Sequence, residues 1–403
     1  MKLLYFTMEY CDEVTAQTSG VLKKIFGQMA ALTNLGIEVE YIVRIDGFVY
    51  LVTGDSKHKL CASSGTAYFD FKNVAKGLRP YIDAKRWDVV YVRYCGTNGS
   101  NLAIYRRCKQ QGMQVMLEIP TYPFKQELGR SVKGRLIYLL NQIYNSQLKR
   151  YVQSIVTYND VEFIYGIPTI KISNGVQVED YRLGTYRINE TLNLILLGTL
   201  EKWHGYDRIL AGLAEYYKKE KEKEKEKEKE KEKEKEKEKE KENGAAREKV
   251  IKLHIVGTGV EMDNYRTFVN EHQLTPYVTF HGIKGGDELD AIFAESDLGI
   301  NSIGCHRKGV TELSTLKSRE FMARGLPFVY SAKDTALKGD EFFALRIPED
   351  DSAVDMEQLI GFHEGLGQRK DIAESIRQFA KEQVSWEGQM KKVLDNIQKI
   401  KAR

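Results

Sequence analysis

Residues 298–330 read LGINSIGCHRKGVTELSTLKSREFMARGLPFVY. The stretch begins with the apolar run Leu298–Asn301 and ends with a second apolar run, Pro327–Tyr330. Between them, Ser318–Arg324 mixes apolar and charged residues in the pattern of an amphipathic helix. Short apolar strands joined by amphipathic helices are typical of a parallel sheet that is covered by helices on both faces. The stretch therefore predicts an α/β fold.

The same alternation extends over the rest of the chain. In the first half it predicts strands over Lys2–Met8, Glu38–Arg44, Asp88–Tyr94, Gln114–Ile119, Ser154–Tyr158 and Thr169–Ser173, with helices over Gly20–Leu35, 70–84, Asn98–Gln111 and 131–151. In the second half it adds strands over Leu192–Leu197, Val250–Val256 and Val278–Phe280, and helices over Gly205–Tyr217, Val260–His272, Asp287–Glu295, 353–365 and 368–400. We therefore predict two doubly wound, Rossmann-like domains in tandem, with a ligand cleft between them.

The composition is that of an ordinary globular chain once one segment is set aside. The 403 residues carry a net charge of +4, and 29% of them are charged. Residues 219–242 are a strict Lys-Glu alternation; without it about 25% of the chain is charged, the usual globular share. This excludes a disordered chain and a strongly basic nucleic-acid binder, so we expect no nucleic-acid partner.

The Lys-Glu alternation falls between a predicted helix and a predicted strand of the second half. In a helix, every pair four residues apart would carry like charges and every pair three apart opposite charges, so the pairing energies largely cancel. We interpret 218–247 as a solvent-exposed, low-complexity insertion. A tract that binds a partner is the alternative.

The cysteines and the apolar runs bear on the compartment. The five cysteines are scattered and form no Cys-x-x-Cys pair, which disfavours a disulfide framework or a zinc site and favours a reducing cytoplasm. The first apolar run, Leu3–Met8, is cut off by Glu9 and is too short for a signal-peptide core. No run approaches the roughly 18 apolar residues of a membrane span. We expect a cytoplasmic protein.

The motif with the most chemical content lies in the stretch quoted first. Seven residues separate Glu312 from Glu320, and Glu320 opens the run Glu-Phe-Met-Ala-Arg-Gly-Leu-Pro before an apolar strand. This pattern resembles the donor-binding signature of retaining glycosyltransferases of the B fold (GT-B), especially family 4. The resemblance implies an enzyme that transfers a sugar from a nucleotide-diphosphate donor with retention of configuration.

Further motifs match that family in the same order along the chain. They are Thr18-Ser-Gly20-Val, Ile172-Ser-Asn-Gly-Val176, Leu197-Gly198-Thr, His254-Ile-Val-Gly257-Thr-Gly259 and Phe280-His-Gly282-Ile283. Apart from the insertion, the similarity covers nearly the whole chain. It implies an acceptor-binding domain over 1–184, a nucleotide-sugar domain over 185–385, and a last helix, 386–403, that returns to the first domain.

The predicted donor site combines these motifs. The first N–H groups of a helix have no partner within the helix and bind anions, so we assign the diphosphate to the residues before the helix predicted from Ser318. By resemblance, Glu320 binds ribose hydroxyls, Glu312 is a catalytic residue that contacts the donor sugar, and the backbone near Gly282 and Ile283 receives the base. The remaining predicted donor-binding residues are Gly20, Gly198, Gly257, Gly259, Ser314, Thr315, Leu316 and Lys317.

The chain departs from the family where the leaving diphosphate is neutralised. An Arg and a Lys usually do this in family 4, and Thr199 and His204 stand at their positions here. Negative charge that develops on a leaving group must be stabilised. We predict Lys202 and His204 as catalytic replacements; Lys317, Lys308 and Arg307 are further sources of positive charge.

A second departure concerns the acceptor side. Many family members place a His at the end of the strand Gln114–Ile119, where this chain has Pro120. We predict Glu118 and Tyr122 as acceptor-side residues and identify no acceptor-activating base. In the mechanism usually proposed for the family, a phosphate oxygen of the leaving group takes the acceptor proton. No Asp-x-Asp follows a predicted strand, so we expect no metal. Gly257-Thr-Gly259 lacks the third Gly of a dinucleotide fingerprint, which disfavours NAD, and we expect no cofactor.

A basic predicted helix suggests where the acceptor comes from. Residues 1–187 carry 24 Lys and Arg against 16 Asp and Glu, and the helix over 125–151 interleaves basic and apolar residues. Such a helix binds an anionic membrane surface, where lipid-linked acceptors lie, or packs with a basic outer face. Both interpretations stay open.

The resulting prediction is a glycosyltransferase that acts on a glycan or lipid-linked acceptor in cell-surface polysaccharide assembly. One alternative is another nucleotide-sugar enzyme of the same fold, such as a 2-epimerase. A second is a non-catalytic scaffold protein that uses the Lys-Glu tract. A retaining glycosidase is disfavoured, because eight residues along a helix separate the two Glu by roughly 12 Å, whereas the carboxyl pair of such enzymes is about 5 Å apart.

Overall fold

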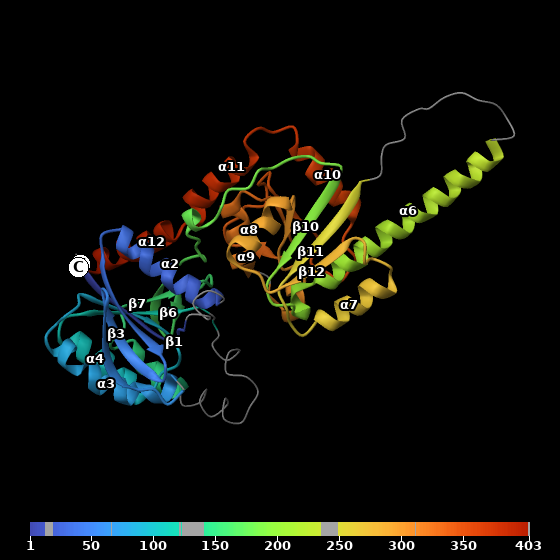
Figure 1. Cartoon of the computed structure of the whole chain (residues 1–403). Helices are drawn as coiled ribbons and strands as arrows, with labels where there is room; N and C mark the ends of the chain where they lie inside the picture. The colour runs from blue at the N-terminus through green and yellow to red at the C-terminus, as the bar shows by residue number, and fades with distance from the viewer. Residues whose placement is uncertain are drawn as a thin grey trace. The chain divides into compact units, whose positions relative to one another are not determined.

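The computed structural model describes residues 1–12, 19–65, 67–120, 122, 141–234, 249–310 and 312–401. The chain forms two compact units, which are Met1–Val176 with Val384–Arg403 (unit 1) and Gln177–Gln383 (unit 2) (Figure 1). Most of the basic helix predicted over 125–151, the later part of the Lys-Glu tract and Thr18 lie outside the described residues.

Unit 1 is built on a nine-stranded sheet with the order β4-β3-β2-β1-β5-β6-β7-β9-β8. The central strands are parallel; β3 and β4 form an antiparallel hairpin at one edge, and β8 is antiparallel at the other. The strands are β1 Lys2–Tyr10, β2 Glu38–Ile45, β3 Phe48–Thr53, β4 Ser56–Ala62, β5 Val89–Arg93, β6 Gln114–Ile119, β7 Ser154–Thr157, β8 Phe163–Ile164 and β9 Ile167–Lys171. The helices are α2 Gly20–Asn34, α3 Ala67–Asp83, α4 Gly99–Gln110 and α12 Trp386–Lys401.

Strand β1 shows why both faces of this sheet are covered. Side chains alternate across a strand, and Leu4 and Phe6 join one buried cluster while Leu3 and Tyr5 join another. The second cluster includes residues of α2 and α12, which lie side by side in Figure 1. Six consecutive residues of β1 are therefore buried, as expected for a central parallel strand.

The C-terminal region differs from the single helical segment predicted over 368–400. It consists of α11 (Ile372–Phe379), a π-helical turn (Ala380–Val384) and α12. The break occurs where the chain passes from unit 2 to unit 1, since α11 packs on one core and α12 on the other. Trp386 at the start of α12 fits against Gly27 and Gly175, where an added Cβ would lie 2.4 Å from its ring.

Unit 2 has a six-stranded sheet in the order β12-β11-β10-β13-β15-β17, all parallel. This is the doubly wound order, in which the first strand lies in the middle and the chain winds outward in both directions. The strands are β10 Thr191–Leu197, β11 Val250–Val256, β12 Val278–Gly282, β13 Leu298–Ile300, β15 Phe328–Tyr330 and β17 Ala344–Arg346. The helices are α6 Tyr206–Glu234, α7 Met262–Glu271, α8 Gly286–Glu295, α9 Leu316–Arg324, α10 Met356–Leu366 and α11. The fold class predicted from the sequence, two Rossmann-like α/β domains, is confirmed.

The division between the units falls after Val176, whereas the sequence placed it after residue 184. The intervening segment is held by unit 2. Arg377 donates hydrogen bonds to the carbonyl oxygens of Val178 (2.8 Å) and Tyr181 (2.7 Å), and the Gly184 amide donates to the carbonyl oxygen of Arg324 (2.8 Å).

Helix α6 is longer than the helix predicted over Gly205–Tyr217. It continues to Glu234, so the described part of the Lys-Glu tract prolongs α6, and Figure 1 shows it extending beyond the rest of unit 2. Near its start the tract still touches the unit, because Lys221 donates a hydrogen bond to Gln273 (3.1 Å). Over the described part of the chain, no helix is both long and apolar enough to cross a membrane.

Candidate functional site

Three glycines form a bare backbone floor at the carboxyl ends of β10, β11 and β12. Gly198, Gly257 and Gly282 have φ values of 120°, 126° and 69°, which favour glycine. The Gly257 amide donates to the Gly282 carbonyl (2.7 Å), and a Cβ on Gly257 would lie 1.9 Å from the carbonyl oxygen of Gly198. Only glycine fits at Gly257, because the Gly198 backbone fills the space beside it. The space beside Gly282 is open, so a ligand can approach the backbone there.

Gly259 serves to pack two loops. The Leu200 amide donates to the Thr258 carbonyl (3.0 Å), and a Cβ on Gly259 would lie 2.5 Å from the Leu200 nitrogen. The structure therefore accounts for this predicted donor residue by the close approach of the loops after β10 and β11.

The N-terminus of α9 is fixed beside this floor. The Thr315 hydroxyl caps the helix by accepting from the Ser318 amide (3.2 Å) and donates to the Asn301 side chain (2.9 Å) at the end of β13. The helix begins at Leu316 instead of the predicted Ser318, so Leu316 and Lys317 occupy its first two positions. Their amides have no carbonyl four residues earlier within the helix and are oriented for an anion.

Lys317 brings a positive charge to the same place. Its Nζ donates to the Tyr206 hydroxyl (2.7 Å) and to Ser302 Oγ (3.0 Å), and a Cβ on Gly198 would lie 3.5 Å from its Cε. The side chain is half-buried, and burial lowers the pKa of Lys317 to about 7. Neither Tyr206 nor Ser302 was predicted from the sequence. For Ser302 a signal was available, because it is a polar residue directly after the predicted strand Leu298–Asn301; Tyr206 lies in a predicted helix and had no such signal.

His204, predicted as a catalytic residue in place of the family's Lys, carries no positive charge near neutral pH. It is 2% exposed, and burial, followed by the nearby charges of Lys317 and Lys308, lowers its pKa to about 3. Its Nδ1 accepts from the Glu201 amide (3.4 Å). The imidazole is therefore neutral at neutral pH, so a catalytic role of His204 at the leaving group would be that of an uncharged hydrogen-bonding group.

The other candidate cations differ in how they are held. Arg307 forms ion pairs with Asp207 (2.7 Å) and Asp351 (2.7 Å), so its charge is already compensated. Lys308 is exposed, with its Nζ 4.3 Å from the centroid of the Trp203 ring. Lys202 is exposed as well, and its carbonyl oxygen accepts from Arg307 (2.7 Å).

The two glutamates of the motif lie on different elements. Glu312 is on the short strand β14 (Glu312–Leu313), which pairs with β16 (Lys333–Asp334), and its carboxylate lies 3.1 Å from the Lys333 ammonium. Glu320 on α9 forms an ion pair with Arg324 (3.0 Å). Both carboxylates are partly exposed and keep oxygens that can accept from hydroxyl groups.

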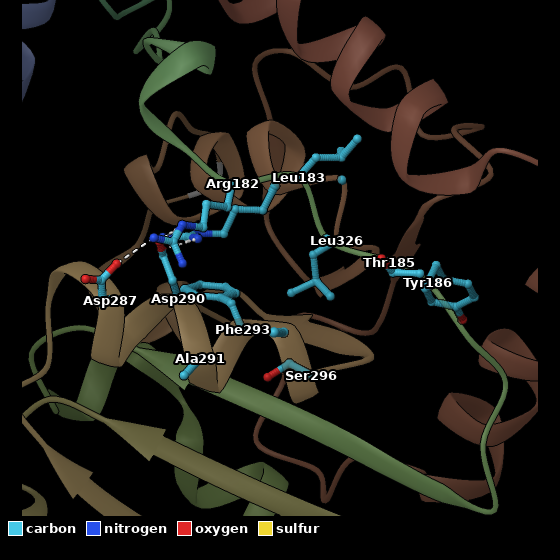
Figure 2. Close-up of a pocket in the computed structure, with 14 residues that line it drawn as sticks. Arg182, Leu183, Thr185, Tyr186, Asp287, Asp290, Ala291, Phe293, Ser296 and Leu326 are labelled. Atoms are coloured by element: carbon cyan, nitrogen blue, oxygen red, sulfur yellow. Dashed lines mark hydrogen bonds and ion pairs between the residues drawn. The ribbon is translucent and has the colours of Figure 1, made fainter.

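A cavity of about 210 Å³ lies elsewhere in unit 2, between α8, residues 182–186 and residues 324–326 (Figure 2). In Figure 2 Arg182 points toward Asp287 and Asp290, with which it forms ion pairs of 2.6 and 3.1 Å. Among the residues lining this cavity, all from the described chain, none is a predicted donor residue. Its walls come from three separate segments without a shared motif, so no sequence pattern indicates it.

The remaining predicted residues belong to unit 1. Gly20 is the first residue of α2, which Ser19 caps by accepting from the Leu22 amide (3.3 Å). The Tyr122 amide donates to the Asn159 side chain (3.2 Å), and its ring lies edge-on to Tyr165.

Glu118 is fully buried and therefore does not present its carboxylate to an acceptor as predicted. It accepts from Tyr91 (2.9 Å), Tyr158 (3.1 Å) and Arg93 (2.8 Å), and the Lys24 ammonium lies 3.5 Å away. Burial acts to raise the pKa of Glu118, but Lys24 and Arg93 hold it below its ordinary value. Glu118 thus ties α2 to the sheet as a buried carboxylate.

Within the described residues, no group of three or more His, Cys, Asp or Glu side chains is arranged to hold a metal ion.

The candidate site consists of a glycine floor, a capped helix N-terminus and a lysine, all at the carboxyl edge of one parallel sheet. Ligands of doubly wound sheets bind at this edge.

Comparisons with known proteins bear on the fold. No family model matches the sequence, and no curated protein matches it. Solved structures do resemble the whole chain. Sucrose-phosphate synthase from Thermosynechococcus elongatus is 11% identical, with a TM-score of 0.63 over 100% of this chain and 99% of that one. A glycosyltransferase from Rickettsia africae is 13% identical, with a TM-score of 0.60 over 99% of this chain and 98% of that one. Anabaena HepE in complex with UDP is 11% identical, with a TM-score of 0.54 over 99% of this chain and 100% of that one. At these identities the likeness shows a shared GT-B fold.

Proposed function

We propose that the protein is a glycosyltransferase of the family 4 type. It transfers a sugar from a nucleoside-diphosphate donor to a glycan or lipid-linked acceptor with retention of configuration. The observation that carries this proposal is the convergence of the glycine floor, the first turn of α9 and Lys317 at one sheet edge. A diphosphate suits this place, because the first amides of α9 and a cation favour an anion, and the backbone at Gly282 is open to a ligand.

The other predicted residues take roles around that diphosphate. Ser314 and Thr315 precede the amides of Leu316 and Lys317, which bind phosphate oxygens. Ile283 is 68% exposed just after Gly282 and offers an apolar surface to the base. Glu320 accepts from ribose hydroxyls, and Glu312 from the donor sugar.

The reaction needs few further groups from the protein. The bond between the sugar and the leaving diphosphate breaks, and the acceptor hydroxyl attacks from the same face. A phosphate oxygen of the leaving group takes the acceptor proton, which accounts for retention without a protein base. We propose that no metal or cofactor is required, since cationic and amide groups stabilise the charge on the leaving group.

We also propose a cellular setting. The enzyme acts in the cytoplasm in cell-surface polysaccharide assembly, with the basic segment 125–151 in contact with an anionic membrane. Sedimentation with vesicles that contain an anionic lipid, compared with neutral vesicles, tests the membrane contact.

UDP is the first donor nucleotide to test, because the HepE structure, which shares this fold, contains UDP. The experiment is a thermal-shift comparison of UDP, GDP, ADP and CMP. A ligand at 100 times its dissociation constant stabilises by ~2.7 kcal/mol, which shifts the unfolding temperature visibly. If none of the four stabilises the protein, the proposed function is wrong.

Chemistry is then followed by NMR with the sugar donors of the stabilising nucleotide. Transfer with the donor's anomeric configuration, undiminished by EDTA, is the expected result. Isomerisation of the donor with no acceptor present would instead identify an epimerase.

A further inference from the structure

Lys317 is a half-buried cation that donates hydrogen bonds to two uncharged hydroxyl groups. Its two hydrogen bonds go to the hydroxyls of Tyr206 on α6 and Ser302 after β13. Among the described residues, no carboxylate forms an ion pair with Lys317. Over the described part of the chain, no carboxylate therefore balances its charge.

The titratable groups that face Lys317 do not balance it either. Burial raises the pKa of Tyr206 far above neutrality, raises that of Cys305 to about 11, and lowers that of His204 to about 3. These groups come from α6 and from the short 3-10 helices Cys305–Lys308 and Lys202–His204, and all three are neutral near pH 7.

The nearby arginines of unit 2 are arranged differently. Arg307 is paired with Asp207 and Asp351, and Arg319 on the same helix as Lys317 is paired with Asp334 (2.6 Å). A charge that is partly removed from water and has no ionic partner loses stabilisation, and its pKa shifts toward the neutral form. A lysine left in this condition at the edge of a sheet where ligands bind points to an anion as its missing partner.

The surrounding geometry leaves a place for that anion. Lys317 lies against Gly198 of the glycine floor and occupies the second position of α9. Thr199 carries no charge and His204 is neutral, so Lys317 supplies positive charge here from α9. We propose that Lys317 pairs with the diphosphate of the donor and takes up a proton from solvent when the donor binds. This inference rests on the proposed function.

Proton uptake gives the site a characteristic pH dependence. The pKa of Lys317 is about 7 in the free protein, and a neighbouring diphosphate raises it. Below pH 7 the ammonium is already present, and binding takes up no proton there. Above pH 7 each binding event takes up a proton, so affinity falls by up to about tenfold per pH unit until the pKa of the complex is reached.

The test is calorimetric titration of the full chain with UDP, GDP and ADP at pH 6 and pH 8. Each titration is run in two buffers of different ionisation enthalpy, which yields the number of protons exchanged. The wild type is expected to take up little at pH 6 and to approach one proton per diphosphate at pH 8. Phosphate itself titrates near pH 6, so the difference between the wild type and the variants is the quantity that decides.

Two variants of Lys317 separate proton uptake from charge pairing. Lys317→Arg keeps a permanent charge, so it is expected to bind at pH 8 without the extra proton uptake. Lys317→Met is expected to lose affinity roughly 10- to 100-fold, the range of a charge-assisted hydrogen bond. Lys338→Met, at an exposed position of the same unit, is the control and is expected to match the wild type in both affinity and proton uptake.

The outcomes separate a failure of the inference about Lys317 from a failure of the proposed function. Wild-type proton uptake in Lys317→Arg, or unchanged affinity in Lys317→Met, overturns the inference while leaving the proposed function in place. If Lys317→Met does not fold, proton uptake in Lys317→Arg decides alone. If no diphosphate binds the wild type, the proposed function fails and the inference with it.

Discussion

The ammonium group of Lys317 lies 2.7 Å from the hydroxyl of Tyr206, which in turn donates to the carbonyl oxygen of Leu197 at 3.0 Å. One phenol thus connects the first turn of α9 to the end of β10. Because the Tyr206 ring is fully buried, its hydroxyl holds the Lys317 ammonium in a fixed position. The relationship makes Tyr206 a positioning residue for the anion site.

Tyr206→Phe is expected to weaken UDP binding about 3- to 10-fold and to lower the free energy of unfolding by about 1 kcal/mol, the net value of a hydrogen bond. Titration calorimetry and urea unfolding measure the two quantities. Tyr216→Phe is the matched control on the same helix, since its hydroxyl donates to the Lys249 carbonyl at 2.8 Å, away from the site. Equal losses of affinity in both variants would show that Tyr206 acts only on stability.

The glycine floor gives a second prediction. Gly257→Ala places a Cβ 1.9 Å from the carbonyl oxygen of Gly198 at a φ of 126°, so the backbone must move. We expect a loss of several kcal/mol in unfolding free energy, in line with other strained core substitutions, and loss of nucleotide binding. Gly361→Ala in α10 is the control, because nothing lies within 4 Å of its added Cβ. It is expected to be neutral or stabilising by up to ~1 kcal/mol. Similar denaturant midpoints for the two variants would contradict this prediction.

Much of this site could be predicted from the sequence, because it depends on local signals. Gly198, Gly257 and Gly282 follow apolar strands, and parallel strands bring their carboxyl ends to one edge. Thr315 is a hydroxyl residue directly before a helical pattern, which is the ordinary capping signal. The fold followed from the same alternation of strands and helices.

The parts that were wrong depend on packing that no local pattern encodes. Burial neutralises His204, although Lys202, two residues earlier, is exposed as in a surface loop. The side chains that contact Glu118 come from α2, β5 and the residue after β7. Glu118 is therefore buried only once the sheet has assembled. The helical pattern over 368–400 is broken because its two halves pack on different cores.

Glu118 yields a prediction about unit 1. Glu118→Gln leaves Lys24 and Arg93 without their buried counter-ion and is expected to cost about 3–5 kcal/mol of unfolding free energy at pH 7. The folded-state pKa of Glu118 is lowered, so its contribution is present above the unfolded pKa and decreases as the pH falls through the folded value. Urea unfolding between pH 7 and pH 3 measures this.

The control for Glu118 is Glu9→Gln. Glu9 lies 3.8 Å from Arg93 but is half exposed, so its loss is expected to cost less than about 1 kcal/mol. Equal effects of the two substitutions would mean that burial does not distinguish the two carboxylates.

The Lys-Glu tract is expected to be dispensable for nucleotide binding, because its described part prolongs α6 away from the glycine floor. Deletion of residues 219–242 should leave the UDP-induced thermal shift and the transfer activity unchanged. Glu312→Ala and Glu320→Ala should each reduce transfer. The reverse result, with the deletion inactive and both substitutions active, would favour a scaffold protein over a transferase.

Lys317 should also affect how the free energy of unfolding of the free protein depends on pH. Its pKa is lowered from 10.5 in the unfolded chain to about 7 in the folded one, so between these values the unfolded state binds more protons. For this group the stability of the free protein therefore rises as the pH increases from about 7 to about 10.5, and holding the charged form costs stability at lower pH. Lys317→Met removes that cost and is expected to be more stable than the wild type at pH 6, with a smaller difference at pH 9.

Thermal unfolding at the two pH values, with and without UDP, checks this prediction. A residue retained for structure would lose stability on substitution at both pH values. A residue retained for an anion gains stability in the free protein and loses the ligand-induced shift. Lys338→Met should show neither change, because its side chain is exposed. A Lys317→Met protein that is less stable than the wild type at pH 6 would contradict the assignment of an uncompensated charge to this position.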